Sequence, residues 1–181
     1  MILPDVNVLI YAFRADSPRH AVYKKWLNGI VLGDERFGMS PLALSAVCRI
    51  TTDSRIFTKP STLDEAFAYA DNLLSQPHCE IVEPGERHGP IFRDLCVKTG
   101  TRGPRMSDAW FAALAIEHGC TFVTFDRDYA RFPGLSWQVP GGPARAFSRK
   151  VDTGFRQKTR QTKESRARFR LEEEGTCSSR A

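Results

Sequence analysis

The chain has 181 residues, of which 41% are hydrophobic and 26% charged. These values are ordinary for a soluble globular protein and exclude a collagen, a coiled coil and a wholly disordered chain. The longest apolar run, residues 109–116, is too short to span a bilayer. Five scattered cysteines encode neither a disulfide framework nor a zinc ribbon. Because no basic segment precedes the acidic residue at position 5, we expect a cytoplasmic protein without a secretory signal.

The net charge of +5 is distributed unevenly along the chain. Residues 141–181 carry 11 basic and 5 acidic side chains, whereas residues 1–140 carry 15 basic and 16 acidic ones. The composition changes at the Pro-Gly-Gly-Pro segment 140–143, which is a loop signal. We therefore expect a domain over residues 1–140 and a basic tail over residues 141–181. The tail is expected to be disordered or partly helical, because it has few apolar residues to offset the entropy of ordering.

Within residues 1–140, short apolar runs alternate with segments that carry helix start and stop signals. In chain order, the pattern predicts a strand at 2–3, a helix capped at Ser17 and continuing to Ile30, a helix capped at Ser40 over 42–50, a helix from the capping box at Thr62 to Leu74, a strand at 79–82, a helix from Pro84 to Gly100, a helix capped by Ser107 over 108–118, and a strand at 120–124. The alternation predicts an α/β fold with a small parallel sheet flanked by helices.

Acidic side chains follow two of the predicted strands. Asp5 follows the first strand and Asp126 the last, while Asp108 lies in the first turn of a helix whose preceding loop should emerge at the same edge. Open α/β sheets bind ligands beyond the carboxyl ends of their strands, so we expect the three carboxylates to converge. Such a cluster, with no His or Cys, suits Mg²⁺ or Mn²⁺ and phosphate-ester chemistry. Taken singly, Asp5 and Asp108 are equally well explained as a turn residue and a helix-dipole residue.

Three segments resemble motifs of the PIN-domain ribonucleases. Residues 3–10, LPDVNVLI, are similar to the opening DxNxLI motif, and residues 107–115, SDAWFAALA, to the central DAxLAALA motif. Residues 123–132, VTFDRDYARF, are similar to the closing TxDxDF segment. The three motifs occur in the family's order and at about its spacing, and the resemblance covers residues 1–140. It is strongest to the VapC-type toxins of bacterial toxin–antitoxin pairs and implies a PIN-like fold.

The resemblance implies a metal-dependent endoribonuclease, the toxin of a toxin–antitoxin system, that hydrolyses RNA phosphodiester bonds with a metal-activated water. Asp5, Asp108 and Asp126 would be the catalytic residues and would hold one or two Mg²⁺ or Mn²⁺ ions. Asn7 and Thr124 would support them through polar contacts. The implied partners are RNA, a cognate antitoxin and a second copy of the chain in a homodimer, with no membrane involved.

The chain departs from the family pattern on its second helix. The family usually has a Glu three positions before an Arg, and here Ala46 stands three positions before Arg49. This loss leaves open whether one or two ions bind. Asp128 is either a further ligand or the first-turn residue of the next helix. A degenerate PIN scaffold that acts as an RNA-binding or protein-interaction module through its tail is the alternative, and a PIN nuclease that works in RNA processing without an antitoxin is a third hypothesis.

The basic tail carries the RNA-binding part of that alternative. Its cations, with Phe155 and Phe169 among them, would follow a phosphate backbone and stack on bases, and the competing interpretation is a solvated extension. The candidate RNA-binding residues are Arg156, Lys158, Arg160, Lys163, Arg166 and Arg168.

Overall fold

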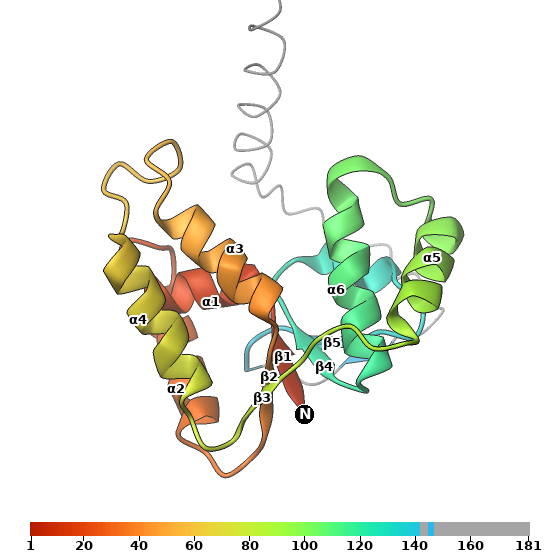
Figure 1. Ribbon diagram of the computed structural model, residues 1–181, viewed down its shortest axis with the longest axis horizontal. Helices are drawn as coiled ribbons and strands as arrows, with labels where there is room; N and C mark the ends of the chain where they lie inside the picture. Colours follow the sequence, from red (N-terminus) through yellow and green to blue (C-terminus); the bar gives the residue numbers. More distant parts are fainter. Residues whose placement is uncertain (142–144, 147–181) are drawn as a thin grey trace, which may run out of the picture. The chain divides into compact units, whose positions relative to one another are not determined.

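The computed structural model describes residues 1–141 and 145–146 (Figure 1). The predicted boundary between a domain at 1–140 and a tail at 141–181 stays a prediction, because most of the tail lies outside the described residues. Within the described part, no helix is long and apolar enough to cross a membrane. The strands are β1 (Ile2–Pro4), β2 (Phe37–Met39), β3 (Cys79–Ile81), β4 (Thr121–Val123), β5 (Ser136–Gln138) and β6 (Arg145–Ala146). The helices are α1 (Val6–Phe13), α2 (His20–Val31), α3 (Pro41–Thr51), α4 (Leu63–Leu74), α5 (His88–Thr99) and α6 (Met106–Glu117), with short 3₁₀ helices η1 (Gly103–Arg105) and η2 (Arg127–Arg131).

The strands form one sheet in the order β3-β2-β1-β4-β5-β6. The first five are parallel and β6 runs antiparallel to β5. The chain steps from β1 towards one edge and then crosses back to β4 on the other side of β1. Connections between parallel strands are right-handed. The helices that lead from β1 to β2 and from β2 to β3 therefore lie on one face of the sheet, and those that lead from β3 back to β4 lie on the other. Figure 1 shows this arrangement, with α1 to α4 on one side and α5 and α6 on the other. The expected α/β fold with a parallel sheet flanked by helices is confirmed.

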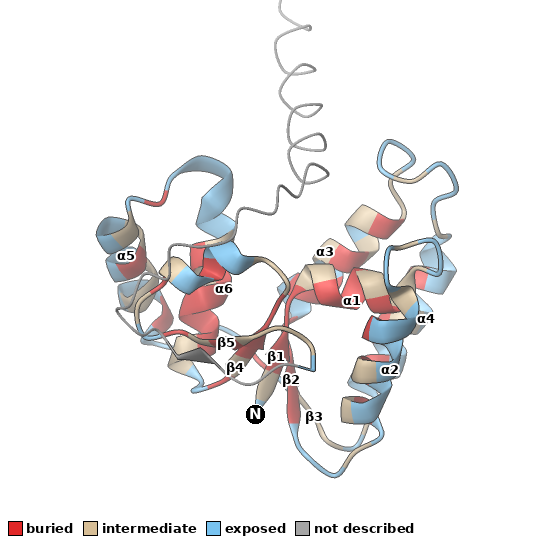
Figure 2. Ribbon diagram, turned by 180° about the vertical axis from the view of Figure 1, so that it is seen from behind, coloured by how far each residue is buried: buried red, intermediate tan, exposed pale blue. Residues whose placement is uncertain are grey.

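The core lies on both faces of the sheet, as the buried residues in Figure 2 show. Leu3 of β1, Phe37 of β2 and Phe122 of β4 are at most 1% exposed. On α6, residues 111–115 are all buried and three of them are alanines. Small side chains allow this helix to approach the sheet closely, so its first turn is held firmly at the strand ends.

Several helix boundaries follow the local signals in the sequence. Thr62 and Glu65 form a reciprocal capping box, with the Thr62 hydroxyl accepting from Glu65 N–H at 3.1 Å and the Glu65 carboxylate accepting from Thr62 N–H at 2.8 Å. Pro41 occupies the first turn of α3 directly after Ser40. Gly100 ends α5 in the left-handed conformation, with φ of 61°. These three boundary predictions are confirmed because each depends on residues within one turn of the boundary.

Three predicted helix starts are wrong. The helix α2 begins at His20, after Arg19 in the left-handed conformation. Ser17 does not cap this helix, because its N–H bonds to the Arg14 carbonyl in a turn. The helix α6 begins at Met106, and the Ser107 hydroxyl donates to the Pro104 carbonyl instead of capping the helix. The helix α5 begins at His88, four residues after the predicted start at Pro84. The helix α1 and the strands β2 and β5 were not predicted, and the short strand β6 lies in the segment that was expected to be disordered or partly helical.

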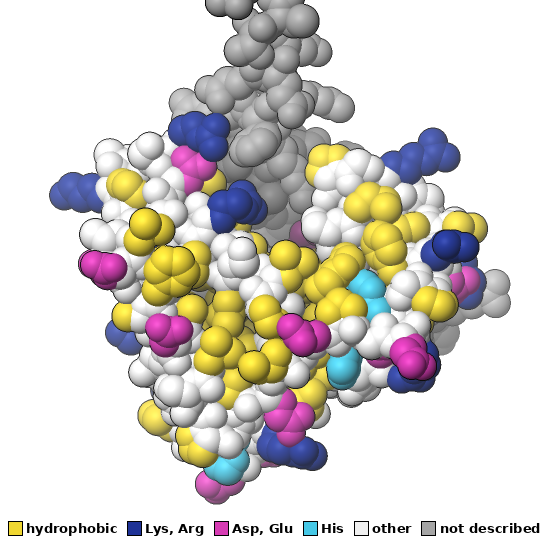
Figure 3. All heavy atoms as spheres, viewed as in Figure 1, with side chains coloured by type: hydrophobic (Ala, Val, Ile, Leu, Met, Phe, Trp, Pro, Cys, Tyr) yellow, Lys and Arg dark blue, Asp and Glu magenta, His cyan; other side chains and the backbone are white. Residues whose placement is uncertain are grey.

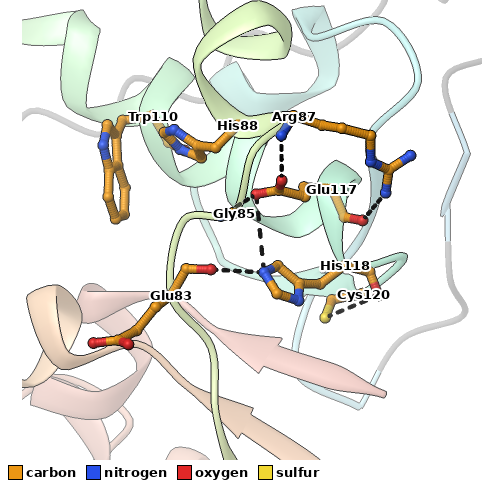
Figure 4. Close-up of polar contacts among 8 residues, drawn as sticks. All are labelled: Glu83, Gly85, Arg87, His88, Trp110, Glu117, His118 and Cys120. Atoms are coloured by element: carbon orange, nitrogen blue, oxygen red, sulfur yellow. Dashed lines mark hydrogen bonds and ion pairs between the residues drawn. The ribbon is translucent and has the colours of Figure 1, made fainter.

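The late start of α5 has its cause in a contact with the end of α6 (Figure 4). The Glu117 carboxylate accepts hydrogen bonds from the backbone N–H groups of Gly85 and Arg87, both at 2.9 Å. The Arg87 guanidinium donates to the Glu117 carbonyl at 2.6 Å, and His118 Nε2 donates to the Glu83 carbonyl at 2.7 Å. We call these five residues the Glu117 clamp. The clamp holds residues 83–87 as a loop and fixes α5 beside α6.

Candidate active site

The carboxyl ends of the central strands bring the first site residues together. Pro4 of β1 is level with Val123 of β4, so Asp5 and Thr124 follow their strands side by side. Asp5 N–H bonds to the Val123 carbonyl at 2.9 Å, which continues the strand pairing into the site. Strand order reverses between β1 and β4, and ligands of open α/β sheets bind at such a switch point.

The Thr124 hydroxyl connects the two strand ends. It donates to Asp5 Oδ2 at 2.6 Å and accepts from Asn7 Nδ2 at 3.1 Å and from Asp126 N–H at 3.0 Å. Thr124 is fully buried, so solvent does not compete for these bonds. Since the hydroxyl has a single proton, its two donors direct that proton towards Asp5. The structure thus brings together Asp5, Asn7 and Thr124, all of them candidates from the sequence.

Asp5 is 6% exposed, and its carboxyl group has an unusual acidity. Burial raises its pKa from 3.8 to about 7, against the opposing effect of the Thr124 hydrogen bond. The negative charges of Asp108 and Asp126 raise the pKa further. Because an anionic Asp5 is disfavoured by its neighbours, the crevice favours the binding of a cation.

Asp108 and Asp126 approach the same place from two other elements. Asp108 lies in the first turn of α6, and Asp126 follows β4 directly before η2. The pKa of Tyr129, a buried residue of η2, is raised by burial first and then by the charges of all three carboxylates. The charges of all three carboxylates therefore act on Tyr129, and their joint role as catalytic and metal-binding residues stays a prediction.

Asp128 occupies the first turn of η2, where it is exposed. Its backbone N–H donates to Asp126 Oδ1 at 2.9 Å, which fixes the Asp126 carboxylate at the start of the turn. This position agrees with the first-turn interpretation of Asp128, and its role as a further ligand stays a prediction. Ala46 lies half-buried on α3, and its methyl group offers no ligand atom.

The donor set fits a hard divalent cation held by few protein ligands. All the site's side-chain acceptors are oxygens, and Asn7 Oδ1 is buried without a hydrogen-bond partner among the described residues. Over the same residues, no three His, Cys, Asp or Glu side chains lie close enough to hold an ion jointly. Mg²⁺ is commonly bound by one or two carboxylates and several waters, which this geometry can provide.

Sequence reasoning missed two polar residues at the site. Ser40 directly follows β2, the neighbour of β1, and its buried hydroxyl has no hydrogen-bond partner in the described structure. Recognising β2 as a strand would have placed Ser40 beside Asp5. Arg131 ends η2, and its Nη2 lies 3.9 Å from Asp108 Oδ2. No local signal marks Arg131, because its neighbour is distant in sequence.

The candidate RNA-binding residues of the tail lie outside the described residues. They are Arg156, Lys158, Arg160, Lys163, Arg166 and Arg168. Their role stays a prediction, as does the role of the tail as a whole.

The family model for the PIN domain matches residues 2–135. The chain belongs to the PIN domain family. Among curated PIN-domain relatives, Ribonuclease VapC25 of Mycobacterium tuberculosis is 39% identical over 135 residues, covering 75% of this chain and 95% of the relative. Ribonuclease VapC43 of the same organism is 39% identical over 140 residues, covering 77% and 95%. The family resemblance inferred from three motifs is confirmed.

Solved structures agree with this PIN fold. VapBC2 from Rickettsia felis, bound to a fragment of promoter DNA, has a TM-score of 0.58 at 19% identity and covers 77% of this chain and 98% of that one. VapC20 from M. tuberculosis, a sarcin-ricin loop cleaving toxin, has a TM-score of 0.55 at 17% identity and covers 75% and 98%. At such identities the likeness concerns the fold alone.

Proposed function

We propose that this PIN-domain protein is a metal-dependent endoribonuclease, the toxin of a toxin–antitoxin pair. The observation that supports the proposal is the buried Asp5 carboxyl at the switch point of the sheet, bonded to Thr124 and subject to the negative charges of Asp108 and Asp126. Relatives at 39% identity are named as VapC ribonucleases and match 95% of their length. The chemistry of the site and the sequence similarity to these ribonucleases both favour hydrolysis of RNA phosphodiesters.

The chain's own residues have distinct roles in this proposal. Asp5 and Asp108 would hold one Mg²⁺ or Mn²⁺ ion, and Asp126 would orient ordered water beside it. When bound, such a cation activates water for attack and neutralises charge at the phosphodiester. Thr124 keeps the Asp5 carboxylate oriented by donating its proton to Oδ2. Asn7 fixes that hydroxyl through Nδ2, which leaves Asn7 Oδ1 to accept from a water or from a ribose hydroxyl.

Cleavage of a structured RNA by the full-length protein tests this function. We expect cleavage with Mg²⁺ or Mn²⁺, loss of cleavage in EDTA and recovery when the metal is restored. Asp5→Asn and Asp108→Asn each remove one charged ligand, and each should abolish cleavage while the folded circular dichroism spectrum is retained. Glu80→Gln, a charge change on β3 away from the site, is the control. Full activity of either Asp variant or in EDTA would overturn the proposal, and RNA binding without any cleavage would favour the degenerate scaffold.

The proposed partners are a cognate antitoxin and a second copy of the chain, both in the cytoplasm. Solved relatives of the fold include toxin–antitoxin complexes. Figure 3 shows hydrophobic side chains gathered over one face of the described domain. On α4, Leu63 and Phe67 are 62% and 54% exposed and lie one turn apart. Light scattering of the purified chain tests the homodimer, for which twice the mass of 20.4 kDa is expected; the monomer mass would contradict it.

A further inference from the structure

Arg131 is a cation set into the rim of the acidic site. It ends η2, five residues after Asp126, and 24% of its side chain is exposed. Its guanidinium carbon lies 4.9 Å from the centre of the Phe132 ring, so the side chain is supported by an aromatic surface. Its Nη2 is 3.9 Å from Asp108 Oδ2, which is an ion pair too long for a hydrogen bond.

Two donors of Arg131 have no acceptor in the part of the chain that the structure describes. Nε and Nη2 are both buried and lack a hydrogen-bond partner among the described residues. A buried charged donor without an acceptor is costly to the folded state, because it has lost its water and gained nothing in return. Donors left in this condition beside a crevice are available to a ligand that brings its own acceptor atoms.

The geometry of the two donors selects the ligand. Nε and Nη2 form one edge of the planar guanidinium, and their parallel N–H groups match two oxygens of a phosphate or carboxylate. Asp5, Asp108 and Asp126 repel a nucleic-acid backbone at this place, so a fixed cation is needed next to them. The surroundings of Tyr129 include the three carboxylates and Arg131 together, which places this cation at the acidic site.

We propose that Arg131 binds the non-bridging oxygens of an RNA phosphodiester at the η2 side of the site. This inference rests on the proposed ribonuclease function for the identity of its ligand. Arg131 touches the substrate directly and draws its backbone towards Asp108, one of the residues that would hold the cation. The competing account is that Arg131 only balances the charge of Asp108.

Three variants of the full chain separate these accounts. Arg131→Gln removes the charge and the paired donors, whereas Arg131→Lys keeps the charge and removes the pairing. Arg127→Gln is the matched control, because Arg127 is exposed on the same short helix and its loss changes the net charge equally. Binding of a fluorescent RNA oligonucleotide is measured in EDTA over a range of salt concentrations, and KM and kcat are measured with Mn²⁺. Thermal unfolding shows that each variant is folded.

We expect Arg131→Gln to weaken RNA binding several-fold. The salt slope, which is the slope of the logarithm of the binding constant against the logarithm of the salt concentration, should become shallower by about 0.7, the value for one lost contact to a single-stranded backbone. Arg127→Gln should change the slope less. Arg131→Lys should keep the slope and raise KM more than it lowers kcat. Equal slopes and equal KM values for Arg131→Gln and Arg127→Gln would overturn the inference. If Arg131→Gln does not fold, Arg131→Lys decides, and a wild-type KM for it overturns the inference.

Binding in EDTA does not depend on cleavage, so the two proposals fail separately. Binding that depends on Arg131, without metal-dependent cleavage, supports the phosphate contact and overturns the ribonuclease. Cleavage with a salt slope and KM that do not change in Arg131→Gln supports the ribonuclease and overturns the phosphate contact.

Discussion

Two largely buried carboxylates of this domain have opposite environments. Asp5, at the strand ends, has one hydroxyl donor and two negative neighbours, and its pKa is raised mainly by burial. Glu117, in the Glu117 clamp, is also affected by burial, but two backbone N–H groups hold its pKa below the usual value. A carboxylate with its full set of donors stabilises the fold, whereas one with few donors beside like charges keeps its capacity for a ligand. The comparison separates a structural acid from a functional one.

Among variants that keep all three carboxylates of the site, the largest expected effect comes from removing the hydroxyl that orients Asp5. Thr124→Val keeps the shape but loses the donor to Asp5 and the acceptor for Asn7 and Asp126. We expect the initial rate of RNA cleavage to fall about 10- to 100-fold, as for other supports of metal ligands. Thr121→Val makes the same change at the other end of β4, where the hydroxyl has one long contact of 3.4 Å, and should retain the rate within about twofold. Equal rates for both variants would contradict the role of Thr124.

Changing Glu117 should affect stability and leave the chemistry intact. Glu117→Ala removes the acceptor of two backbone N–H groups, so we expect the free energy of unfolding in urea to fall by about 2 to 4 kcal/mol. Glu117→Gln keeps one acceptor oxygen and should cost less. Below the unfolding transition, the rate of RNA cleavage should match that of the wild type. A slow but fully stable Glu117→Ala variant would remove the distinction between the two carboxylates.

The two acids should respond to pH in opposite directions. The pKa of Asp5 is raised from 3.8 to about 7, so the folded state binds its proton more tightly than the unfolded state does. In EDTA, stability from this group is full below about pH 4 and is lost as the pH rises through about 7, a change on the order of 1–4 kcal/mol. The pKa of Glu117 is lowered, so its contribution is present above about 4.5 and is lost as the pH falls through the folded pKa.

Urea unfolding in EDTA between pH 3 and pH 8 measures both slopes. Asp5→Asn should abolish the decline between pH 4 and pH 7 and leave the decline at acid pH. Glu117→Gln should do the reverse. A wild-type decline above pH 4 that persists unchanged in Asp5→Asn would contradict the assignment to Asp5.

The smallest expected effect concerns the edge of the clamp. His118→Ala removes the hydrogen bond from Nε2 to the Glu83 carbonyl, in a side chain that is 33% exposed. We expect a loss of about 1 kcal/mol in the free energy of unfolding, since the exposed carbonyl can bond to water instead. A loss equal to that of Glu117→Ala would show that the histidine, and not the carboxylate, carries the clamp.

Much of the site could be predicted because it depends on strand ends. A short apolar run followed by an acid is a local pattern, and it correctly placed Asp5 and Asp126 after neighbouring strands, whereas Thr124 came from the family resemblance. The strand β2 was missed because its middle residue, Gly38, is unfavourable in strands and interrupts the apolar run. The start of α5 was predicted too early because the Glu117 contact spans 32 residues and overrides the signal of Pro84. Arg131 was missed for the same reason, because its place at the site depends on its proximity to Asp108, which is distant in the sequence.

The hydrogen bond between Thr124 and Asp5 also determines when the site can form during protein synthesis. Its partners are separated by 119 residues, and they come from the first and fourth strands. At a synthesis rate of about 5 to 20 residues per second, the N-terminal partner waits about 6 to 24 seconds on the ribosome before the other is made. Until then Asp5 lacks both the hydroxyl that orients its carboxylate and the Val123 carbonyl of β4 that accepts its backbone N–H. The Asp5–Thr124 contact therefore cannot form until nearly all of the PIN domain has been synthesised.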